Sequence, residues 1–280
     1  MLKHIQGKFT QNSSVVYNKT LFRVAPAAVF DGQFIPDGVE IIGSKAVTGS
    51  KTSDVFIPSS VRKIRDKAFE YSAIEKVRFA MTTDDPETGT AYVDSIAETA
   101  FNHCFKLEKF IGPMKNGSLR VTPDCLGLYR DTTLLAFALG STMKSNESPV
   151  TTWSIPDNLG IKKLAKGVFD MEGAGRDIQL RKLGLPSTLT HICTLVFQSL
   201  GIPQGEVLKI YFKGDTPPVV DQGAFMNVTP KTICLYVPAV LNSDNSVNQD
   251  ATEKRKKLYL DAMGMGDSFF SIESYTDWPF

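Results

Sequence analysis

The chain has 280 residues, of which 42% are hydrophobic and 22% are charged, and this balance is typical of a folded protein. Its 31 basic residues are matched by 30 acidic ones, which gives no electrostatic attraction toward nucleic acid or an anionic membrane surface. The longest apolar run, around Leu134 to Leu139, is far shorter than the roughly 20 residues that cross a bilayer.

A short pattern repeats along the chain, and its clearest copy runs from Val55 to Phe79. Its most regular feature is a small or aliphatic residue followed by an aromatic or a valine: Ala46-Val47, Ala68-Phe69, Ala100-Phe101, Val168-Phe169, Val196-Phe197 and Ala224-Phe225. An aliphatic residue stands five positions before the end of each pair: Ile42, Ile64, Ile96, Leu164, Ile192 and Val220. An Ile-Pro or Leu-Pro step recurs upstream at Pro36, Pro58, Pro156 and Pro186.

Such a pattern predicts a solenoid of stacked coils. A repeat of about 22 to 28 residues cannot bury its own apolar edge, so neighbouring copies must stack into one continuous core. The apolar positions one and three residues before the proline position alternate with polar ones, which predicts one short β-strand per repeat. Proline then ends the strand, and a turn or one helical turn should follow.

The sequence predicts that the chain has three parts. Residues 1–19 form an amino-terminal segment or cap, and residues 20–240 form the solenoid. Two similar segments, Thr20–Ala25 and Thr133–Ala138, are predicted to be β-hairpin insertions that project from the stack, and they divide the solenoid into blocks of about 15–111 and 112–240. Residues 241–280 form a carboxyl-terminal cap with a helix over Asp250–Met263, stopped by Gly264 and Gly266, and a strand at Phe269–Ile272.

The repeat resembles the BspA-like, Treponema-pallidum-type leucine-rich repeat family, whose pattern is I-P-x-x-V-x-x-I-x-x-x-A-F-x-x-C-x-x-L. The matching residues include Ile57-Pro58, Val61, Ile64 and Ala68-Phe69, then Ile96, Ala100-Phe101, Cys104 and Leu107, then Leu185-Pro186, Leu189, Ile192 and Phe197. The end of the chain is also similar to the family's ending, with Tyr236-Val237-Pro238, Lys257-Leu258-Tyr259 and Phe269–Ile272. The departures are Val47 in place of Phe, a repeat lengthened after Pro156, and a poorly matching stretch over residues 112–131.

The resemblance implies a leucine-rich repeat solenoid: a right-handed coil, mostly β, with turns and short helical arms. It also implies a secreted or cell-surface protein of host-associated bacteria or protozoa. The expected partners are a host matrix or cell-surface protein, a glycan, or another microbe's surface. The amino end, Met1 to Lys8, lacks the apolar segment of a secretory signal, so either the protein is cytoplasmic or a signal lies outside this sequence. The resemblance favours the second alternative.

The sequence predicts no catalytic site, no cofactor and no metal centre. The histidines, His4, His103 and His191, are scattered, and no known catalytic or nucleotide-binding motif is present. The four cysteines, Cys104, Cys125, Cys193 and Cys234, lack metal-ligand spacing. We expect them to be small buried hydrophobic residues, with a disulfide between coils as the alternative.

The candidate binding surface is the outward face of the strands. If the residues one and three positions before the proline position point into the core, then the residue between them points outward. This column contains Phe34, Phe56, Arg78, Ser154, Gly184, Tyr211 and Tyr236. Aromatic residues and arginine are favoured at binding hot spots, but aromatic residues are also favoured in strands generally.

The sequence therefore predicts a non-enzymatic, extracellular binding or adhesion module, with Phe34, Phe56, Arg78, Tyr211 and Tyr236 as ligand-binding candidates. The alternative is a structural spacer or surface-layer component without a dedicated ligand. Alanine at Tyr211 and Tyr236 together is expected to abolish binding without unfolding the protein.

Overall fold

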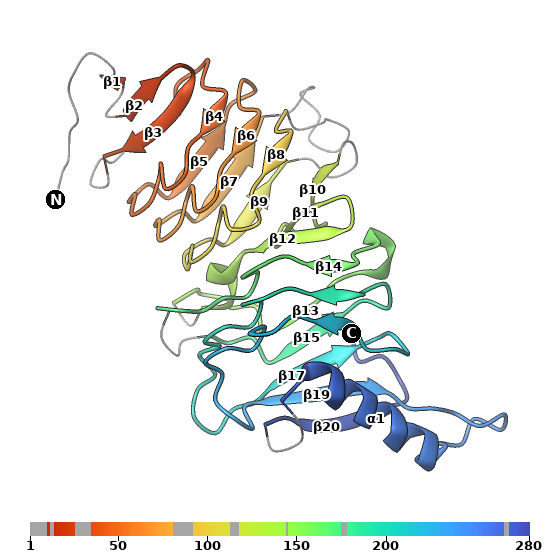
Figure 1. The fold of residues 1–280 in the computed structure, drawn as a ribbon. Helices are drawn as coiled ribbons and strands as arrows, with labels where there is room; N and C mark the ends of the chain where they lie inside the picture. Colours follow the sequence, from red (N-terminus) through yellow and green to blue (C-terminus); the bar gives the residue numbers. More distant parts are fainter. Residues whose placement is uncertain are drawn as a thin grey trace.

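The residues that the structure describes form four β-sheets and one α-helix in an elongated molecule, with β1 at one end and α1 and β20 at the other (Figure 1). The structure is a computed structural model, and it describes residues 10–11, 14–25, 35–80, 92–112, 118–143, 145–174, 178–265 and 269–280. The sheets form two pairs, which divide the described chain into an N-terminal half up to residue 112 and a C-terminal half from residue 118.

The N-terminal half contains a six-stranded and a three-stranded sheet. The six-stranded sheet has the order β1 (Thr10–Gln11), β2 (Ser14–Tyr17), β3 (Thr20–Val24), β4 (Ile41–Ile42), β6 (Lys63–Ile64) and β8 (Ser95–Ile96). The three-stranded sheet has the order β5 (Asp54–Ile57), β7 (Lys76–Phe79) and β9 (Lys109–Ile111).

The C-terminal half repeats this plan with a six-stranded and a five-stranded sheet. The six-stranded sheet has the order β10 (Leu119–Val121), β11 (Gly127–Arg130), β12 (Thr133–Phe137), β14 (Lys163–Leu164), β16 (His191–Ile192) and β18 (Val219–Val220). The five-stranded sheet has the order β13 (Thr152–Ser154), β15 (Lys182–Leu185), β17 (Leu208–Phe212), β19 (Ile233–Pro238) and β20 (Ser271–Tyr275). Two short 3₁₀ helices, Leu139–Thr142 and Asp157–Leu159, and the α-helix α1 (Gln249–Met263) complete the described elements.

Each regular repeat contributes two strands, and the prediction of one strand per repeat is therefore wrong. The aliphatic position before each Ala-Phe pair lies in a two-residue strand, as Ile64 does in β6 and Ile192 does in β16. These strands pair in parallel with the equivalent residues of the next coil, for example Ile42 with Ile64. Two residues are too few to show an alternating pattern, so the sequence signal for this second strand is weak.

The Ala-Phe pairs lie in turns whose side chains form the centre of the core. Phe69 stacks on Phe101 with ring centroids 4.9 Å apart, and Phe197 stacks on Phe225 at the same distance. Backbone hydrogen bonds also join these turns, such as Phe69 N to Ala100 O at 2.9 Å. The ring spacing is close to the 4.7–4.9 Å between neighbouring strands, so equivalent phenylalanines stack when the coils pair.

The two segments predicted to be hairpin insertions form antiparallel pairs, β2 with β3 and β11 with β12. They do not project from the stack, because β3 pairs in parallel with β4 and β12 pairs in parallel with β14. Each hairpin therefore continues the six-stranded sheet of its own half (Figure 1).

The two halves share no sheet, but a backbone hydrogen bond from Phe110 N to Cys125 O at 2.9 Å joins them, together with side-chain contacts and close backbone packing. His103 Nε2 lies 3.0 Å from Asp170 Oδ2, and Lys163 Nζ lies 2.8 Å from Glu98 Oε1. A Cβ atom on Gly140 would overlap the backbone of the N-terminal half at residue 106, so glycine permits this close approach.

The predicted terminal helix is confirmed. Helix α1 begins after Asn248, whose side chain accepts a hydrogen bond from Ala251 N, and it ends at Gly264 in the left-handed conformation. Its buried Tyr259 donates a hydrogen bond to Gly214 O at 2.6 Å. Strand β20 then pairs in parallel with β19, which places the helix and this strand over the last coil (Figure 1).

Candidate functional site

The outward side of the β5–β7–β9 sheet, here called the N-terminal face, carries the first predicted site residues. Val55 and Val77 are fully buried, whereas the side chains between and beside them point away from the core. Phe56 is 38% exposed, which is unusual for a phenylalanine, and Arg78 beside it is also exposed. The alternation of the strand thus places both residues at the surface.

Two cross-strand rows make up this face. One row aligns Phe56, Arg78 and Ile111, and the other aligns Asp54, Lys76 and Lys109. Each row therefore crosses all three strands of the sheet, and together they place aromatic, aliphatic and charged groups side by side.

Arg78 is held across the strands by Asp54. Its Nε and Nη2 donate to the two carboxylate oxygens at 3.0 and 2.9 Å, and this hydrogen-bonded pair raises the pKa of Arg78. The pairing orients the guanidinium toward Asp54, and Arg78 is the cross-strand neighbour of Phe56, although Arg78 and Asp54 both remain exposed to water. The face consequently offers a planar cation and a phenyl ring in a defined arrangement.

The outward side of the five-stranded sheet, here called the C-terminal face, holds the other described members of the predicted column. Four of them align in one row, in register with Glu273 of β20: Ser154, Gly184, Tyr211 and Tyr236. Tyr211 and Tyr236 stack with centroids 4.4 Å apart, and Lys209 lies 5.7 Å above the Tyr236 ring.

The expectation that Tyr211 is exposed is wrong, because only 6% of this residue is accessible. The end of the chain, residues 276–280, lies over the C-terminal face. Phe280 packs edge-on against Tyr211 at 5.5 Å, and Trp278 packs against the same ring at 6.4 Å. Trp278 also lies 5.4 Å from Lys213 Nζ. Nothing in the repeat pattern predicts this cover, since it comes from outside the repeats.

Both tyrosines of this row have raised pKa values. Burial raises the pKa of Tyr211, and burial together with neighbouring groups raises the pKa of Tyr236 to about 12. Both hydroxyls are therefore neutral at physiological pH. Tyr236 remains half-buried, so it is the more accessible of the two.

Phe34, the remaining candidate, lies outside the described residues. The structure brings Phe56 and Arg78 together on one face and Tyr211 and Tyr236 on another. The two pairs belong to separate sheets, so the described candidates do not form a single continuous row.

His103 has a structural environment that sequence reasoning did not predict. It is 7% exposed, stacks on Tyr71 at 4.7 Å, and lies between Asp170 and Glu70, whose Oε1 is 3.5 Å from Nδ1. Burial lowers the pKa of His103, but the hydrogen bond and charge of Asp170 and the charge of Glu70 outweigh it and raise the pKa overall. The signal for such a contact is weak in the sequence, because His103 and Asp170 are 67 residues apart.

The expectation that the cysteines are buried holds for Cys104, Cys193 and Cys234, whereas Cys125 is half-buried. All four are free thiols, so the alternative of a disulfide between coils is not what the structure shows. Among the described residues, no helix is both long and apolar enough to span a membrane.

Comparison with protein families confirms the resemblance of the repeat. Residues 31–120 match the model of the BspA-type leucine-rich repeat region, in six copies. No curated protein matches the chain.

Several solved structures are similar to this chain. A leucine-rich cell surface protein from Faecalibacterium prausnitzii shares 16% identity with a TM-score of 0.49, over 88% of this chain and 60% of that protein. A leucine-rich repeat protein from Eubacterium ventriosum shares 13% identity with a TM-score of 0.41, over 72% of this chain and 59% of that protein. The pneumococcal vaccine antigen PcpA shares 12% identity with a TM-score of 0.23, over 95% of this chain and 98% of that protein. This chain thus spans less than two thirds of the length of the first two.

Proposed function

We propose that the protein is a non-enzymatic binding module of the cell surface or extracellular space, and that it recognises a protein or glycan through the N-terminal face. The single observation that carries the proposal is the exposed phenyl ring of Phe56 beside the Asp54-held guanidinium of Arg78. The BspA-type repeat over residues 31–120 supports an interaction role, since the resemblance implies adhesion at surfaces.

The chemistry of this face suits a protein surface or a sugar ring. An exposed aromatic side chain gives apolar contact area with little loss of rotamer freedom, and arginine adds planar hydrogen-bonding and stacking contacts. Lys76 and Lys109 border these residues in the adjacent row, which favours partners with carboxylate or other anionic groups at the rim. The C-terminal face is a poorer candidate, because residues 276–280 already contact its central tyrosine.

The direct test is binding of the purified chain to a panel of extracellular matrix proteins and to a glycan array. The double variant Phe56→Ala with Arg78→Ala should weaken binding to any hit by at least about tenfold, as expected when hot-spot residues are removed. A control pair of the same residue types exists in the same half: Phe22 of β3 is 51% exposed, and Arg65, directly after β6, is exposed.

The control variant Phe22→Ala with Arg65→Ala removes the same residue types and should leave binding unchanged. Equal losses in both double variants would contradict the N-terminal face as the site, as would unchanged affinity in the Phe56 and Arg78 variant. If the wild-type chain bound no member of either panel, the result would favour the spacer function over the binding function.

A further inference from the structure

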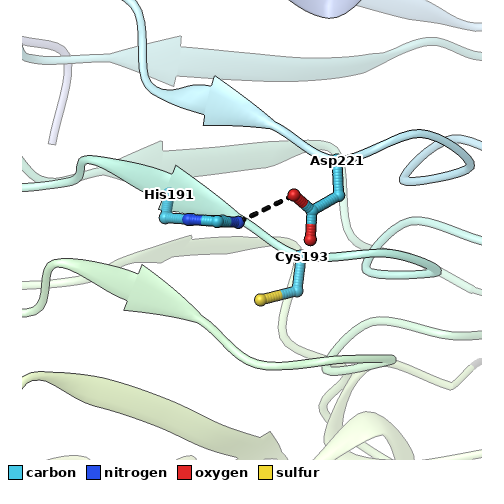
Figure 2. A group of neighbouring side chains, drawn as sticks. All are labelled: His191, Cys193 and Asp221. Carbon is cyan, nitrogen blue, oxygen red and sulfur yellow. Dashed lines mark hydrogen bonds and ion pairs between the residues drawn. The ribbon is translucent and has the colours of Figure 1, made fainter.

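Three side chains with metal-binding atoms converge on one edge of the C-terminal half (Figure 2). His191 belongs to β16, Cys193 follows this strand directly, and Asp221 follows β18 on the next coil. Residues two apart on an extended chain point to the same side, so His191 and Cys193 share one face. Ile192 pairs with Val220, which places Asp221 beside Cys193 on the neighbouring coil.

The backbone at all three positions is anchored to the neighbouring coil. His191 N donates to Lys162 O at 3.0 Å, Cys193 N donates to Leu164 O at 3.2 Å, and Asp221 N donates to Ile192 O at 2.9 Å. The parallel ladder therefore continues through the ligand-bearing residues. A site of this kind is held in position by the fold before any ion arrives, which lowers the cost of ordering it.

The distances suit a small tetrahedral ion. His191 Nε2 lies 2.9 Å from Asp221 Oδ1, and one nitrogen, one sulfur and one oxygen atom all lie within 4.8 Å of one another. Zn²⁺ bound at 2.0–2.3 Å requires ligand atoms about 3.3 to 3.7 Å apart, so small side-chain rotations would create the geometry. Figure 2 shows the imidazole of His191 directed at the carboxylate of Asp221, with the side chain of Cys193 beside them.

Exposure is graded across the site. Cys193 is only 8% exposed, while the side chains of His191 and Asp221 are 38% and 36% exposed. The sulfur thus lies at the base, and the nitrogen and oxygen form a rim that water can reach. An ion held there would keep a position open to solvent or to another molecule.

The net charge of the ionisable groups around the site favours a bound cation. Lys163 lies beside the Cys193 thiol, but its ammonium is also paired with Glu98 at 2.8 Å. With Asp221 ionised, the two carboxylates exceed the single lysine by one negative charge. On metal binding the thiol proton leaves to solvent, and His191 takes the tautomer with its proton on Nδ1, which frees the Nε2 lone pair that otherwise carries the proton shared with Asp221. A divalent ion then neutralises the two remaining negative charges.

We propose that His191, Cys193 and Asp221 form a binding site for a zinc-class divalent cation, with a fourth coordination position open. The mixed nitrogen, sulfur and oxygen donors select a borderline-soft transition metal over Ca²⁺ or Mg²⁺, which take oxygen ligands. This site is in the six-stranded sheet of the C-terminal half, so it is separate from the proposed binding face of β5–β7–β9. Binding of a cation at this site would be independent of the binding function that we propose for the N-terminal face.

A second cluster, His103 with Asp170 and Glu172, has metal-binding atoms at similar distances but a different environment. His103 is buried, and carboxylates already face both of its ring nitrogens. Both ring nitrogens therefore already have acidic neighbours, and an added ion would have to displace these contacts.

The test uses the full chain, reduced and freed of metal, titrated with Co²⁺ and then Zn²⁺. The wild type should bind one equivalent of Co²⁺ with a thiolate-to-cobalt charge-transfer band, and Zn²⁺ should displace it. Cys193→Ser should abolish the band. His191→Ala and Asp221→Asn should each weaken Zn²⁺ binding by at least about tenfold, measured by competition with a chromophoric chelator.

Cys234→Ser is the matched control, because Cys234 is also a free thiol with 8% exposure but lies in the other sheet. It should keep both the band and the affinity. Zn²⁺ should also raise the thermal midpoint of the wild type and of Cys234→Ser, since a ligand that binds the folded state stabilises it. If Cys193→Ser fails to fold, the Zn²⁺ affinities of His191→Ala and Asp221→Asn still decide whether these side chains bind the ion.

The proposal is overturned if the wild type shows no sulfur-to-cobalt band, if Cys193→Ser retains it, or if the rim variants bind Zn²⁺ as tightly as the wild type. An equal loss in Cys234→Ser would also overturn it, because the binding thiol would then lie elsewhere.

Discussion

The same outward-facing column of the repeat is exposed on the N-terminal face and largely buried on the C-terminal face. Phe56 and Arg78 occupy this column on β5 and β7 and are exposed, whereas Tyr211 occupies it on β17 and is buried. The difference comes from residues 276–280, which lie over the second face and contact Tyr211 through Trp278 and Phe280. An outward strand position is therefore a binding position only where no other segment covers it.

Among variants that test this comparison, Tyr211→Ala has the largest expected effect on stability. Loss of a buried aromatic side chain costs about 3 kcal/mol, because four aromatic neighbours lose their contacts: Tyr236, Tyr275, Trp278 and Phe280. Urea unfolding should show this loss in the free energy of unfolding. Phe56→Ala, at the matching position of the exposed face, should change it by less than about 0.5 kcal/mol.

The sequence-based expectation is that alanine at Tyr211 and Tyr236 together abolishes binding without unfolding the protein, and a loss of this size at Tyr211 alone would mean that such a variant also loses stability. Equal, small effects at the two positions would show that the cover by residues 276–280 contributes nothing to stability.

Gly184→Ala should separate the cover from the face beneath it. A Cβ atom there would overlap Ser154 Oγ and lie 3.0 Å from Trp278 Cζ2. This overpacking should lower the free energy of unfolding by about 1–3 kcal/mol. Displacement of Trp278 should increase acrylamide quenching of tryptophan fluorescence, since Trp153 is only 4% exposed and hardly contributes.

Gly214→Ala provides the control, because an added Cβ there would come no closer than 3.4 Å to any neighbour. It should leave quenching unchanged. If Gly184→Ala did the same, Trp278 would not lie against this strand in solution.

A pH titration tests how the two halves are joined. The pKa of His103 is raised by Asp170 of the other half and by Glu70, so the protonated ring stabilises the folded state. For a raised pKa this contribution is fully present below the unfolded value of about 6.5 and is lost as pH rises through the higher folded value. The free energy of unfolding should therefore fall above about pH 6.5 in the wild type.

The variant His103→Gln should remove this component of the pH dependence. His191→Gln, which changes a histidine that is not at the junction of the halves, should retain it. A wild-type stability that rises over the same pH interval would contradict the assigned role of His103.

The smallest expected effect belongs to Arg78→Ala. The Arg78–Asp54 pair is exposed on both sides, and such pairs contribute about 0 to 1 kcal/mol, so unfolding by urea should detect little change. The same variant should weaken ligand binding at the N-terminal face. A large loss of stability would mean that Arg78 supports the fold rather than a ligand.

The repeat pattern was sufficient to predict much of the core. The stacked phenylalanines, the aliphatic column represented by Ile64 and Ile192, and the helix that ends at Gly264 all follow from local periodicity and capping. The second strand of each repeat was missed because two residues carry no periodic signal. The convergence of His191, Cys193 and Asp221 was not predicted, because these residues come from two coils. Aligning Ile192 with Val220 does place Cys193 and Asp221 side by side, so that signal was present in the repeat.

By itself, the sequence determined which residues face the core and which face outward, because the coil period and strand alternation are local properties of the chain. Only the tertiary structure decided which outward residues remain exposed. The burial of Tyr211 depends on Trp278 and Phe280, and the pairing of His103 depends on Asp170 of the other half. These contacts join segments outside the repeat period, and their geometry is fixed only when the coils have stacked.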